Sequence, residues 1–600
     1  MKVKVSDYIA DFLSANGVSH VFSITGGGAI HLNDSIGKAP GLNVVYNHHE
    51  QACAIAAESY ARINNKIALV CVTTGPGGTN ALTGVVGGWL DSIPMLIISG
   101  QVRYDTTARS SGLDIRALGD QEFDITKAAQ CMTKYCEMIT EPKKIKYCLE
   151  KALYIAQSGR PGPCWLDIPL NVQGAYIETG SLDGFDKTEI NTPPAVSKQS
   201  AEMILESLRG AKRPVLYAGN GVNIANARSA FLNAVDALNI PVVTTWNAID
   251  LIYDKHPLYV GRAGMMGDRA GNFAVQNSDL IIAVGNRLSI RQVGYTWKTW
   301  ARAAKVIMCD ADRDEMKKPT LHVDEAIWCD AKDLLEKLAK NRPVTEKTND
   351  SKTEWRLKCA FWKNKYPVVE AKHYSGEELN VYAFIKELSL RLPEGKVTVV
   401  GNGSACVVGS HAYVIKENSR FIINSGAASM GYDLPAAIGA HLACETEVIC
   451  VTGDGSIQMN LQELQTIKHH NMPVKIFVIN NGGYHSIRQT QENLFEGRFT
   501  GIGYASADLS FPDMGKIALA YGIPYFKCSK NGDLNAFLSE VLEKTGAVIA
   551  EVFVTAEQVF EPKSATKKEP DGTLTSPPLE DLAPFLSREE LRENMIIDMQ

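Results

Sequence analysis

Apolar residues in this chain gather in short runs, and the stretches between the runs carry apolar positions at helical spacing. The runs are rich in Val and Ile and include Ile67–Thr73, Met95–Gly100, Pro214–Ala218, Leu280–Val284, Val397–Gly401 and Val548–Val554. A short continuous apolar run predicts a strand buried on both faces, and the amphipathic stretches predict helices that cover a sheet. The alternation therefore predicts an α/β protein built from doubly wound parallel sheets.

Two polar stretches interrupt this pattern and predict linkers. The first is Leu182–Ser200, which contains Thr192-Pro193-Pro194, and the second is Lys340–Trp355, which is rich in Lys, Thr, Asp and Glu. Such compositions are typical of connections between domains. They divide the 600 residues into three predicted domains, 1–180, 195–340 and 370–555, and a tail, 556–600. The end of the tail, Ser587–Met599, predicts a short helix docked on the body or on a partner subunit.

Two polar turns follow neighbouring apolar runs in the last third of the chain. Gly453-Asp454-Gly455 closes the run Thr446–Thr452, and Asn480-Asn481 closes the run Pro473–Ile479. A helix is predicted between them, over Leu461–Asn471. If the two strands are parallel neighbours, both turns lie at one carboxyl edge of a sheet, where α/β proteins bind ligands.

The side chains of these turns suit a metal and a diphosphate. Asp454 offers a hard oxygen anion and Asn481 a carbonyl oxygen, and Mg²⁺ combines few such ligands with phosphate oxygens and water. The glycines and Ser456 allow backbone N–H groups to approach a diphosphate. By itself a Gly-Asp-Gly sequence is also an ordinary βα turn, so the pairing with Asn480-Asn481 carries the prediction.

This pair of turns resembles the signature of thiamine diphosphate enzymes, and motifs elsewhere resemble the FAD-containing acetolactate synthase branch over nearly the whole chain. The resemblance implies three domains, in the order pyrimidine-binding, FAD-like and diphosphate-binding. Glu50, between the run Leu42–Tyr46 and a predicted helix Ala52–Ala61, matches the glutamate that hydrogen-bonds the aminopyrimidine ring. The implied cofactor site is Thr74, Pro76, Asn80, Met430, Gly453, Gly455 and Ser456, and the implied metal site is Asp454, Asn481 and Gly483.

Two further residues match positions near the reacting centre of acetolactate synthases. Gln121 matches a glutamine that faces the active site, and Lys134 matches a lysine near the same place. The candidate catalytic residues are therefore Glu50, Gln121 and Lys134. Lys134 fits a solvated surface position equally well.

The middle domain resembles the form that binds FAD, with the flavin in a structural role without net redox chemistry. Gly219-Asn220-Gly221 follows a predicted strand but is not a full dinucleotide fingerprint. Asp310, Asp312 and Asp330 match positions at the ribose and adenine end, and arginines beside strand ends suit a diphosphate or a flavin carbonyl. The implied FAD site is Gly219, Asn220, Gly221, Thr245, Gly264, Met265, Gly285, Arg287, Arg291, Asp310 and Asp330.

The chain departs from the acetolactate synthase pattern in the expected acceptor pocket. Asp120 stands where the resemblance predicts Phe, Ser486 where it predicts Met, and Thr490 where it predicts Trp. His485 adds a further hydrogen-bonding group, and Gly27 lies in an unusually glycine-rich entry loop. Buried polar groups penalise a ligand that leaves them unpaired. This pocket therefore favours a larger, hydroxylated acceptor.

The resemblance implies a carboligase that decarboxylates pyruvate and transfers a two-carbon unit to a keto acceptor, giving acetolactate. The altered pocket favours an alternative acceptor, a nucleotide-linked 4-keto-deoxy sugar. A pyruvate oxidase, a simple 2-keto acid decarboxylase and a non-catalytic protein are less favoured alternatives. The expected cofactors are thiamine diphosphate, Mg²⁺ and FAD, and the expected assembly is a homodimer or homotetramer with sites at the subunit interface.

Composition sets outer limits on these expectations. The formal net charge is −6 and no basic run stands out, so nothing indicates nucleic-acid binding. The 13 cysteines are scattered and form no CxxC pair, which is typical of reduced thiols in a cytoplasmic protein. We expect neither a signal peptide at the N-terminus nor an apolar stretch near the ~20 residues that cross a membrane.

Overall fold

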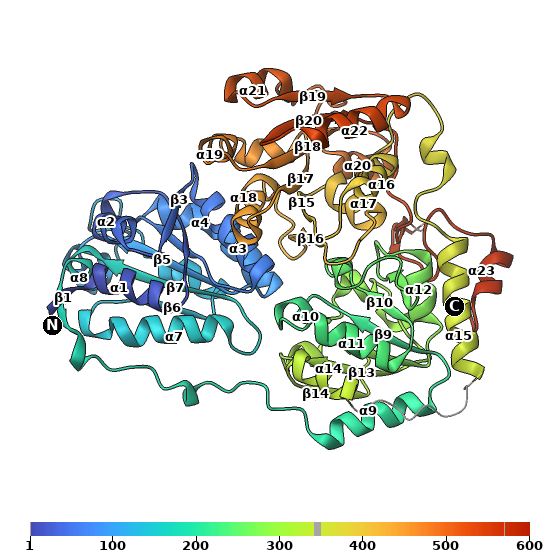
Figure 1. Ribbon diagram of the computed structural model, residues 1–600, viewed down its shortest axis with the longest axis horizontal. Helices are drawn as coiled ribbons and strands as arrows, with labels where there is room; N and C mark the ends of the chain where they lie inside the picture. Colours follow the sequence, from blue (N-terminus) through green and yellow to red (C-terminus); the bar gives the residue numbers. More distant parts are fainter. Residues whose placement is uncertain (1, 341–349, 569–570, 600) are drawn as a thin grey trace.

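The chain folds into three parallel six-stranded sheets, one in each predicted domain (Figure 1). A computed structural model describes residues 2–340, 350–568 and 571–599. In every sheet the strand order is non-sequential, with helices on both faces, so the predicted doubly wound α/β architecture is confirmed. Within the described ranges, no helix is long and apolar enough to cross a membrane.

The N-terminal sheet has the order β3-β2-β4-β5-β7-β6, and its central strands are fully buried. A short antiparallel ribbon of β1 (Lys2–Lys4) and β8 (Tyr176–Glu178) flanks it. The strands are β2 His20–Ser23, β3 Asn43–Tyr46, β4 Leu69–Val72, β5 Met95–Gln101, β6 Tyr135–Met138 and β7 Pro163–Pro169. The main helices are α1 Val5–Ala15, α2 Ile30–Lys38, α3 Glu50–Asn64, α4 Pro76–Asp91, α5 Ala108–Ser111, α6 Ile125–Ala129, α7 Ile145–Gln157 and α8 Leu170–Gln173.

The middle sheet has the order β11-β10-β9-β12-β13-β14. An extended segment without regular strands connects it to the N-terminal domain along the lower edge of Figure 1, as predicted for the first linker. The strands are β9 Pro214–Ala218, β10 Val242–Thr244, β11 Tyr259–Arg262, β12 Leu280–Val284, β13 Lys305–Asp310 and β14 Glu325–Trp328. The helices are α9 Lys198–Gly210, α10 Gly221–Ile224, α11 Arg228–Leu238, α12 Arg269–Gln276, α13 Ile290–Val293 and α14 Ala331–Lys340.

The second predicted linker is wrong from Asp350 onward. Residues 341–349 lie outside the described residues, and helix α15 (Asp350–Lys365) follows. Its Trp355, Cys359 and Trp362 are buried in the core of the middle domain. These residues recur at three- and four-residue spacing on one helix face, a periodicity that the polar composition of the segment obscures.

The C-terminal sheet has the order β16-β15-β17-β18-β20-β19. Strands β17 and β18 are parallel neighbours, as the two polar turns require. The strands are β15 Val397–Val400, β16 Arg420–Ile423, β17 Val448–Gly453, β18 Val474–Asn480, β19 Tyr525–Cys528 and β20 Val548–Phe553. The helices are α16 Val381–Arg391, α17 Ser404–Ala412, α18 Asp433–Cys444, α19 Glu463–His469, α20 His485–Phe495, α21 Met514–Tyr521 and α22 Leu534–Glu543.

Helices α3 and α18 join the first and last domains in one continuous apolar core. Both helices are rich in Ala, and a Cβ at Gly439 of α18 would lie only 2.0 Å from the carbonyl oxygen of Ala56. The helices are antiparallel, because the Tyr432 hydroxyl donates to Glu58 (2.8 Å) whereas the later Gly439 meets the earlier Ala56. The antiparallel packing of α3 and α18 therefore determines which functional residues of the first and last domains can lie close together within one chain.

The tail crosses the C-terminal and middle domains and ends in helix α23 (Arg588–Asn594), which docks beside α15 (Figure 1). The Trp362 indole donates to Asn594 Oδ1 (2.8 Å), and Asn594 Nδ2 donates to the Tyr366 hydroxyl (2.7 Å). The predicted terminal helix is therefore present and packs on the body of its own chain.

Candidate functional site

The two polar turns lie together at the carboxyl edge of the C-terminal sheet. Asp454 directly follows β17 and is 3% exposed, with its Oδ1 accepting from the Gly455 N–H (2.9 Å). Its Oδ2 is buried and has no hydrogen-bond partner among the described residues. Burial raises the pKa of this carboxyl to about 7. A buried carboxylate oxygen without a donor fits a bound cation.

Asn481 directly follows β18 and completes this edge. Its Nδ2 donates to the Ser404 hydroxyl (3.0 Å), which leaves the carbonyl oxygen of the side chain free to face a cation. Gly483, at φ +137°, turns the loop back, and its carbonyl accepts from the His485 N–H (3.0 Å). One carboxylate with amide and backbone carbonyls is a donor set that fits Mg²⁺ bound together with a diphosphate.

Ser456 connects this edge to the loop that carries Met430. The Ser456 hydroxyl accepts from the Gly431 N–H (3.0 Å) and donates to the buried Asp433 carboxyl (2.8 Å). Asn460 Nδ2 also donates to the Gly431 carbonyl (2.7 Å). The structure therefore uses the Ser456 side chain to position the Met430 loop against the diphosphate turn.

Glu50 and the predicted pyrimidine-side residues meet at the carboxyl edge of the N-terminal sheet. Glu50 is the first residue of α3, and Asn80 Nδ2 of α4 donates to its Oε2 (3.0 Å). Pro76 begins α4, and the Thr74 hydroxyl donates to Gln101 Oε1 (2.6 Å).

Gln121 packs against the loop that contains Thr74 and Gly75. Its backbone is left-handed (φ +58°), and its carbonyl lies so close to Gly75 that a Cβ there would approach to 2.8 Å. Gly75 itself has φ +62°, a conformation that favours glycine. Glu50, Thr74, Pro76, Asn80 and Gln121 thus form one group at this edge.

Lys134 is not part of this group, so its catalytic role stays a prediction. It precedes β6 and lies beside the start of β7, at the opposite edge of the sheet from Glu50. Its Nζ donates to the carbonyl oxygens of Ser158 (2.6 Å) and Ile155 at the end of α7. Burial lowers the pKa of this amine to about 8. Lys134 therefore satisfies the last carbonyls of a helix.

The predicted FAD residues surround a cavity of about 710 Å³ between the three domains. This volume is in the range that holds a dinucleotide-sized ligand. Gly221 opens α10, where a Cβ would lie 2.7 Å from Gly285 Cα, so the two glycines allow the turns to meet. Of the predicted residues, the cavity is lined by Gly219, Asn220, Gly221, Thr245, Gly285, Arg287, Arg291, Asp310 and Asp330.

Gly264 and Met265 do not line this cavity but support Arg291, which does. The Met265 N–H donates to the Arg291 carbonyl (2.7 Å), and a Cβ at Gly264 would lie 2.3 Å from that oxygen. The Arg291 guanidinium stacks over the Trp246 ring at 4.8 Å. Trp246 is buried, and its indole N–H has no partner among the described residues.

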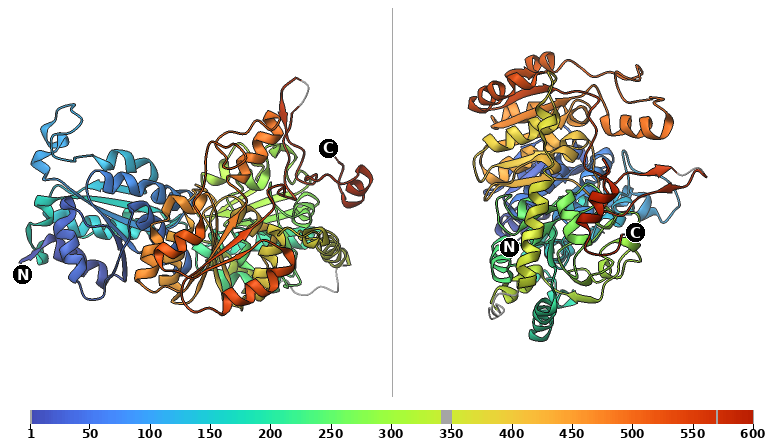
Figure 2. Two further views of the ribbon diagram at one scale, coloured as in Figure 1. Left: turned by 90° about the horizontal axis from the view of Figure 1, so that it is seen from above. Right: turned by 90° about the vertical axis from the view of Figure 1, so that its right-hand side faces the viewer.

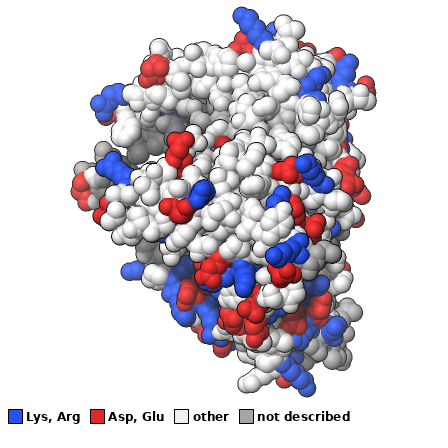
Figure 3. Space-filling view, turned by 90° about the vertical axis from the view of Figure 1, so that its left-hand side faces the viewer, with Lys and Arg blue, Asp and Glu red and all other residues white. Residues whose placement is uncertain are grey.

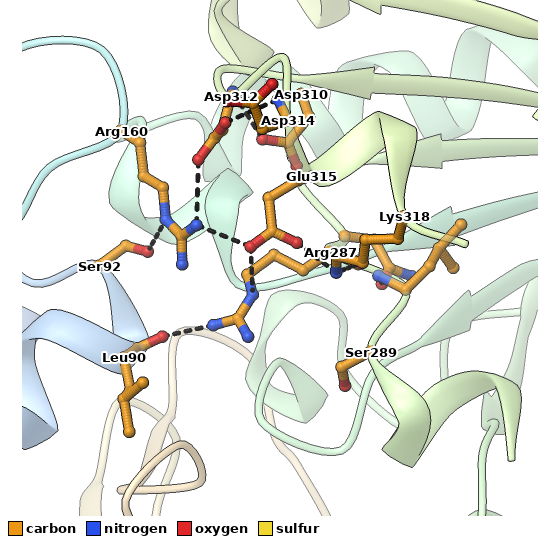
Figure 4. Close-up of polar contacts among 12 residues, drawn as sticks. Leu90, Ser92, Arg160, Arg287, Ser289, Asp310, Asp312, Asp314, Glu315 and Lys318 are labelled. Carbon is orange, nitrogen blue, oxygen red and sulfur yellow. Dashed lines mark hydrogen bonds and ion pairs between the residues drawn. The ribbon is translucent and has the colours of Figure 1, made fainter. Parts of the chain in front are cut away.

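Arg160 is a cavity residue that the sequence analysis missed. It extends from the N-terminal domain to Asp312 (3.1 Å) and Glu315 (2.7 Å) of the middle domain, as Figure 4 shows. Arg287 also pairs with Glu315 (3.4 Å), and burial raises the pKa of the neighbouring Asp310 to about 6. Two cations and several carboxyls at one end of the cavity suit a ligand that carries both phosphates and ribose hydroxyls.

The residues predicted for the acceptor pocket lie in two separate places. Gly27 and Asp120 are exposed on the N-terminal domain, while His485, Ser486 and Thr490 lie on α20 of the C-terminal domain. His485 lines a cavity of about 120 Å³ beside the Asn481–Gly483 loop, and neither Ser486 nor Thr490 lines it.

Comparison with known proteins agrees with this arrangement of sites. Models of the thiamine pyrophosphate enzyme family match the chain domain by domain: the N-terminal TPP binding domain over 3–127, the central domain over 201–338 and the C-terminal TPP binding domain over 401–552. Fold and sites thus define a three-domain thiamine diphosphate enzyme.

Comparison with curated proteins indicates which members of this enzyme family the chain resembles. The chain is 31% identical over 561 residues to acetolactate synthase isozyme 1 large subunit of Escherichia coli (strain K12), covering 93% of this chain and 95% of the relative. It is 32% identical over 562 residues to the isozyme 2 large subunit of the same organism, covering 92% and 95%. A probable acetolactate synthase large subunit of Methanococcus aeolicus is 31% identical over 553 residues, 88% of each chain. The chain belongs to the thiamine pyrophosphate enzyme family and is related to acetolactate synthase large subunits.

Proposed function

We propose that this chain is a Mg²⁺- and thiamine diphosphate-dependent carboligase that decarboxylates pyruvate and transfers the two-carbon unit to a second keto compound, giving acetolactate. The observation that carries the proposal is the pair of sheet edges: Glu50 with Asn80 at one, and Asp454 with Asn481 at the other. The similarity to acetolactate synthase large subunits supports the reaction class. FAD would occupy the 710 Å³ cavity in a structural role.

Each residue has a definite task in this proposal. Thiamine diphosphate, when bound, supplies the electron sink for decarboxylation of a 2-keto acid. Asp454 and Asn481 would hold the Mg²⁺, which would neutralise the diphosphate. Glu50, oriented by Asn80, would hold and move a proton at the pyrimidine end. Met430 would support the cofactor, and its loop is fixed by Ser456.

We further propose that each site combines two chains. In one chain Tyr432 contacts Glu58, and Glu50 lies eight residues earlier on α3, about 12 Å away along the helix axis. Glu50 therefore lies well away from the contact that Tyr432, next to the Met430 loop, makes on α3, and we infer that Glu50 and the Met430 loop of one chain serve different cofactors. If a second copy of the chain supplies its Glu50 to the Asp454 edge of the first chain, both residues can act on one cofactor.

Exposed surface supports an assembly of at least two copies. The segment between β5 and α6 projects from the N-terminal domain (Figure 2) and carries exposed apolar side chains: Leu113, Ile115, Leu118 and Phe123. The face seen in Figure 3 has a broad uncharged area in its upper part, while its acidic and basic side chains are interspersed elsewhere. Exposed apolar side chains together with an uncharged face favour a subunit contact over a nucleic-acid partner.

A nucleotide-linked 4-keto-deoxy sugar is the second candidate acceptor. The observation that favours it is the polar character of Asp120, His485, Ser486 and Thr490, where an acceptor pocket for small 2-keto acids would be apolar. Such groups discriminate strongly by hydrogen bonding and weakly by apolar fit.

Replacing the activating carboxylate tests the proposed function. We expect Glu50→Gln to retain thiamine diphosphate while CO₂ release from pyruvate falls by about 100-fold or more, because the amide cannot exchange a proton. The matched control is Glu137→Gln, which changes an exposed carboxyl on β6. Near-normal turnover by Glu50→Gln would refute the assignment. Bleaching of bound FAD by pyruvate without oxygen would instead establish an oxidase.

A further inference from the structure

The turn that leads into Glu50 is held by a side chain of the C-terminal domain. This turn, 47–49, joins the end of β3 to the start of α3, and helix α19 lies beside it (Figure 1). Glu463, the first residue of α19, accepts at its carboxylate from the His48 N–H (2.9 Å) and from Asn47 Nδ2 (2.8 Å). Glu463 thus connects the two domains immediately before Glu50.

The backbone on either side of this contact is fixed within the N-terminal domain. The Asn47 N–H continues the pairing with the end of β2 (3.2 Å), and His49 caps α3 by accepting a backbone N–H at its Nδ1 (3.1 Å). Between them, the His48 N–H donates to Glu463. The carboxylate therefore holds the backbone at the point where the chain enters α3, whose first residue is Glu50.

The chemistry of Glu463 indicates more than cohesion between domains. The side chain is 0% exposed, and its described partners are all neutral donors, because the third is the Thr466 hydroxyl (2.7 Å). Taking a carboxylate out of water without a counter-charge costs free energy, which an apolar contact between the domains would avoid. Two acceptor oxygens are needed, however, to hold a backbone N–H and a side-chain amide of the turn at once.

Glu463 also lies close in sequence to the turn at the metal edge. A 3-10 helix, Ser456–Asn460, follows Asp454 and leads into α19, and Gln458 Nε2 donates to the Asp454 carbonyl (3.0 Å). The residue therefore extends from the Asp454 edge of its chain and contacts the Glu50 turn of the same chain. In the proposed two-chain site these two places serve different cofactors.

We propose that Glu463 is a positioning residue that acts through Glu50. Its carboxylate fixes the turn, and Asn80 holds the Glu50 carboxyl from the other side (3.0 Å), so that this carboxyl meets the pyrimidine end of the cofactor. The inference rests on the proposed function and deepens it. A residue of the diphosphate-binding domain serves the site to which its chain supplies Glu50.

Two replacements separate the hydrogen bonds from the size of the side chain. Glu463→Leu removes both acceptors at similar size. Glu463→Gln keeps an acceptor for the His48 N–H, and the Asn47 amide, whose Oδ1 is buried and unpartnered among the described residues, can rotate to accept from the new amide. We expect Glu463→Gln to retain proton transfer to within about threefold, and Glu463→Leu to lose about tenfold or more.

Two measurements on the separate variants test this expectation. Without cofactor, backbone hydrogen exchange in the peptide 46–53 should be faster in Glu463→Leu than in the wild type and unchanged in Glu463→Gln. With thiamine diphosphate and Mg²⁺, exchange of the thiazolium C2 proton with D₂O reports proton transfer at the pyrimidine end. It should slow about tenfold or more in Glu463→Leu, while the affinity for the cofactor changes by less than about threefold. Equal losses of exchange and affinity, or Glu463→Gln as slow as Glu463→Leu, would overturn the proposal.

A matched control separates positioning from loss of stability. Asp250 is 1% exposed and, from the middle domain, accepts from Arg420 of the C-terminal domain (2.8 Å), away from the Glu50 turn. Asp250→Asn should lower the thermal midpoint but leave C2 exchange of the loaded enzyme within about twofold of the wild type. If Asp250→Asn slowed C2 exchange as much as Glu463→Leu, the effect of Glu463 would be general destabilisation.

Mixed dimers identify the site that Glu463 serves. When Glu463→Leu is co-expressed with Asp454→Ala, one site of each mixed dimer combines an intact Asp454 edge with a Glu50 held by its own Glu463. About one quarter of the wild-type sites should then release CO₂ from pyruvate. Glu463→Leu with Glu50→Gln contains no such site and should restore almost none.

The reverse pattern would mean that Glu463 acts on the Asp454 edge of its own chain, and would overturn the proposal. Restoration by neither pair, when Glu50→Gln and Asp454→Ala restore each other, would make Glu463 a general structural residue and overturn it as well.

These outcomes are distinct from failure of the proposed function. A wild type that exchanges the C2 proton but releases no CO₂ from pyruvate would refute the carboligase, while C2 exchange in the variants would still decide the role of Glu463. If Glu50→Gln and Asp454→Ala restore nothing together, the two-chain site is refuted, and the Leu and Gln variants alone decide whether Glu463 positions Glu50.

Discussion

The separation of Glu50 from the Met430 loop within one chain makes a quantitative prediction about mixed oligomers. Glu50→Gln and Asp454→Ala are each expected to inactivate, since one lacks the proton-carrying carboxyl and the other the metal ligand. If each site takes Glu50 from one chain and Asp454 from its partner, a mixed dimer of the two variants has one intact site and one doubly altered site. Random pairing makes half of the dimers mixed, so about one quarter of the wild-type sites are restored.

The assay is co-expression of the two variants under different affinity tags, followed by CO₂ release from pyruvate per total dimer. Mixing either variant with itself is the control and should restore nothing. In a second arm, the wild type is co-expressed with the double variant Glu50→Gln/Asp454→Ala. In this arm, sites at the subunit interface leave about one half of the wild-type activity, because wild-type homodimers contribute one quarter and the mixed dimers contribute none only if both of their sites are altered; each mixed dimer has one altered residue in each site, so interface sites leave about one quarter of the wild-type activity, whereas sites within one chain leave about one half.

Activity near zero in the first arm, together with about one half in the second, would refute the two-chain site. It would mean that Glu50 and Asp454 act on one cofactor within one chain. The antiparallel packing of α3 and α18, which places Glu50 about 12 Å along the helix from Glu58, would then not separate Glu50 from the cofactor at Asp454 of the same chain.

Three further predictions test single residues. Asp454→Ala should weaken thiamine diphosphate binding by more than tenfold in the presence of Mg²⁺; unchanged tryptophan quenching by the cofactor would contradict its role as a ligand. Thr490→Trp should shift the product spectrum toward small 2-keto acid acceptors, and an unchanged spectrum would remove Thr490 from the pocket. Asp167 is fully buried with a pKa raised to about 7 by burial. The folded state therefore binds its proton more tightly than the unfolded state, and stability is lost as pH rises from about 4 through 7. Asp167→Asn should remove that loss, up to about 4 kcal/mol, and its thermal midpoint relative to wild type should rise over this pH range. A constant difference in midpoint would contradict the prediction.

The parallel sheets, and the polar residues at their carboxyl edges, could be predicted well from the sequence because both depend on local patterns. Continuous Val and Ile runs identify buried parallel strands, and β17 and β18 lie within a residue or two of their predicted bounds. Nine of the eleven predicted FAD residues line one cavity, because they lie near strand ends of the same sheet or, like Arg291, on the short helix that follows one, and the fold gathers strand ends.

The other features of the fold and the site depend on contacts between distant parts of the chain, which no local sequence pattern records. Lys134 is next to a strand in sequence, but only the sheet topology shows that it lies at the opposite edge of the sheet from Glu50. Arg160 belongs to the N-terminal domain and reaches the cavity only because the middle domain packs against it. The orientation of α3 against α18 is equally non-local, and both helices have an unremarkable Ala-rich sequence.

Product analysis tests the central claim most directly. The purified chain is supplied with thiamine diphosphate, Mg²⁺, FAD and pyruvate, with and without a nucleotide-linked 4-keto-deoxy sugar. The account predicts CO₂ release with a carboligated product: acetolactate from pyruvate alone, or a sugar extended by two carbons when the keto sugar is the acceptor. CO₂ release that yields only acetaldehyde or acetate under both conditions would contradict carboligation.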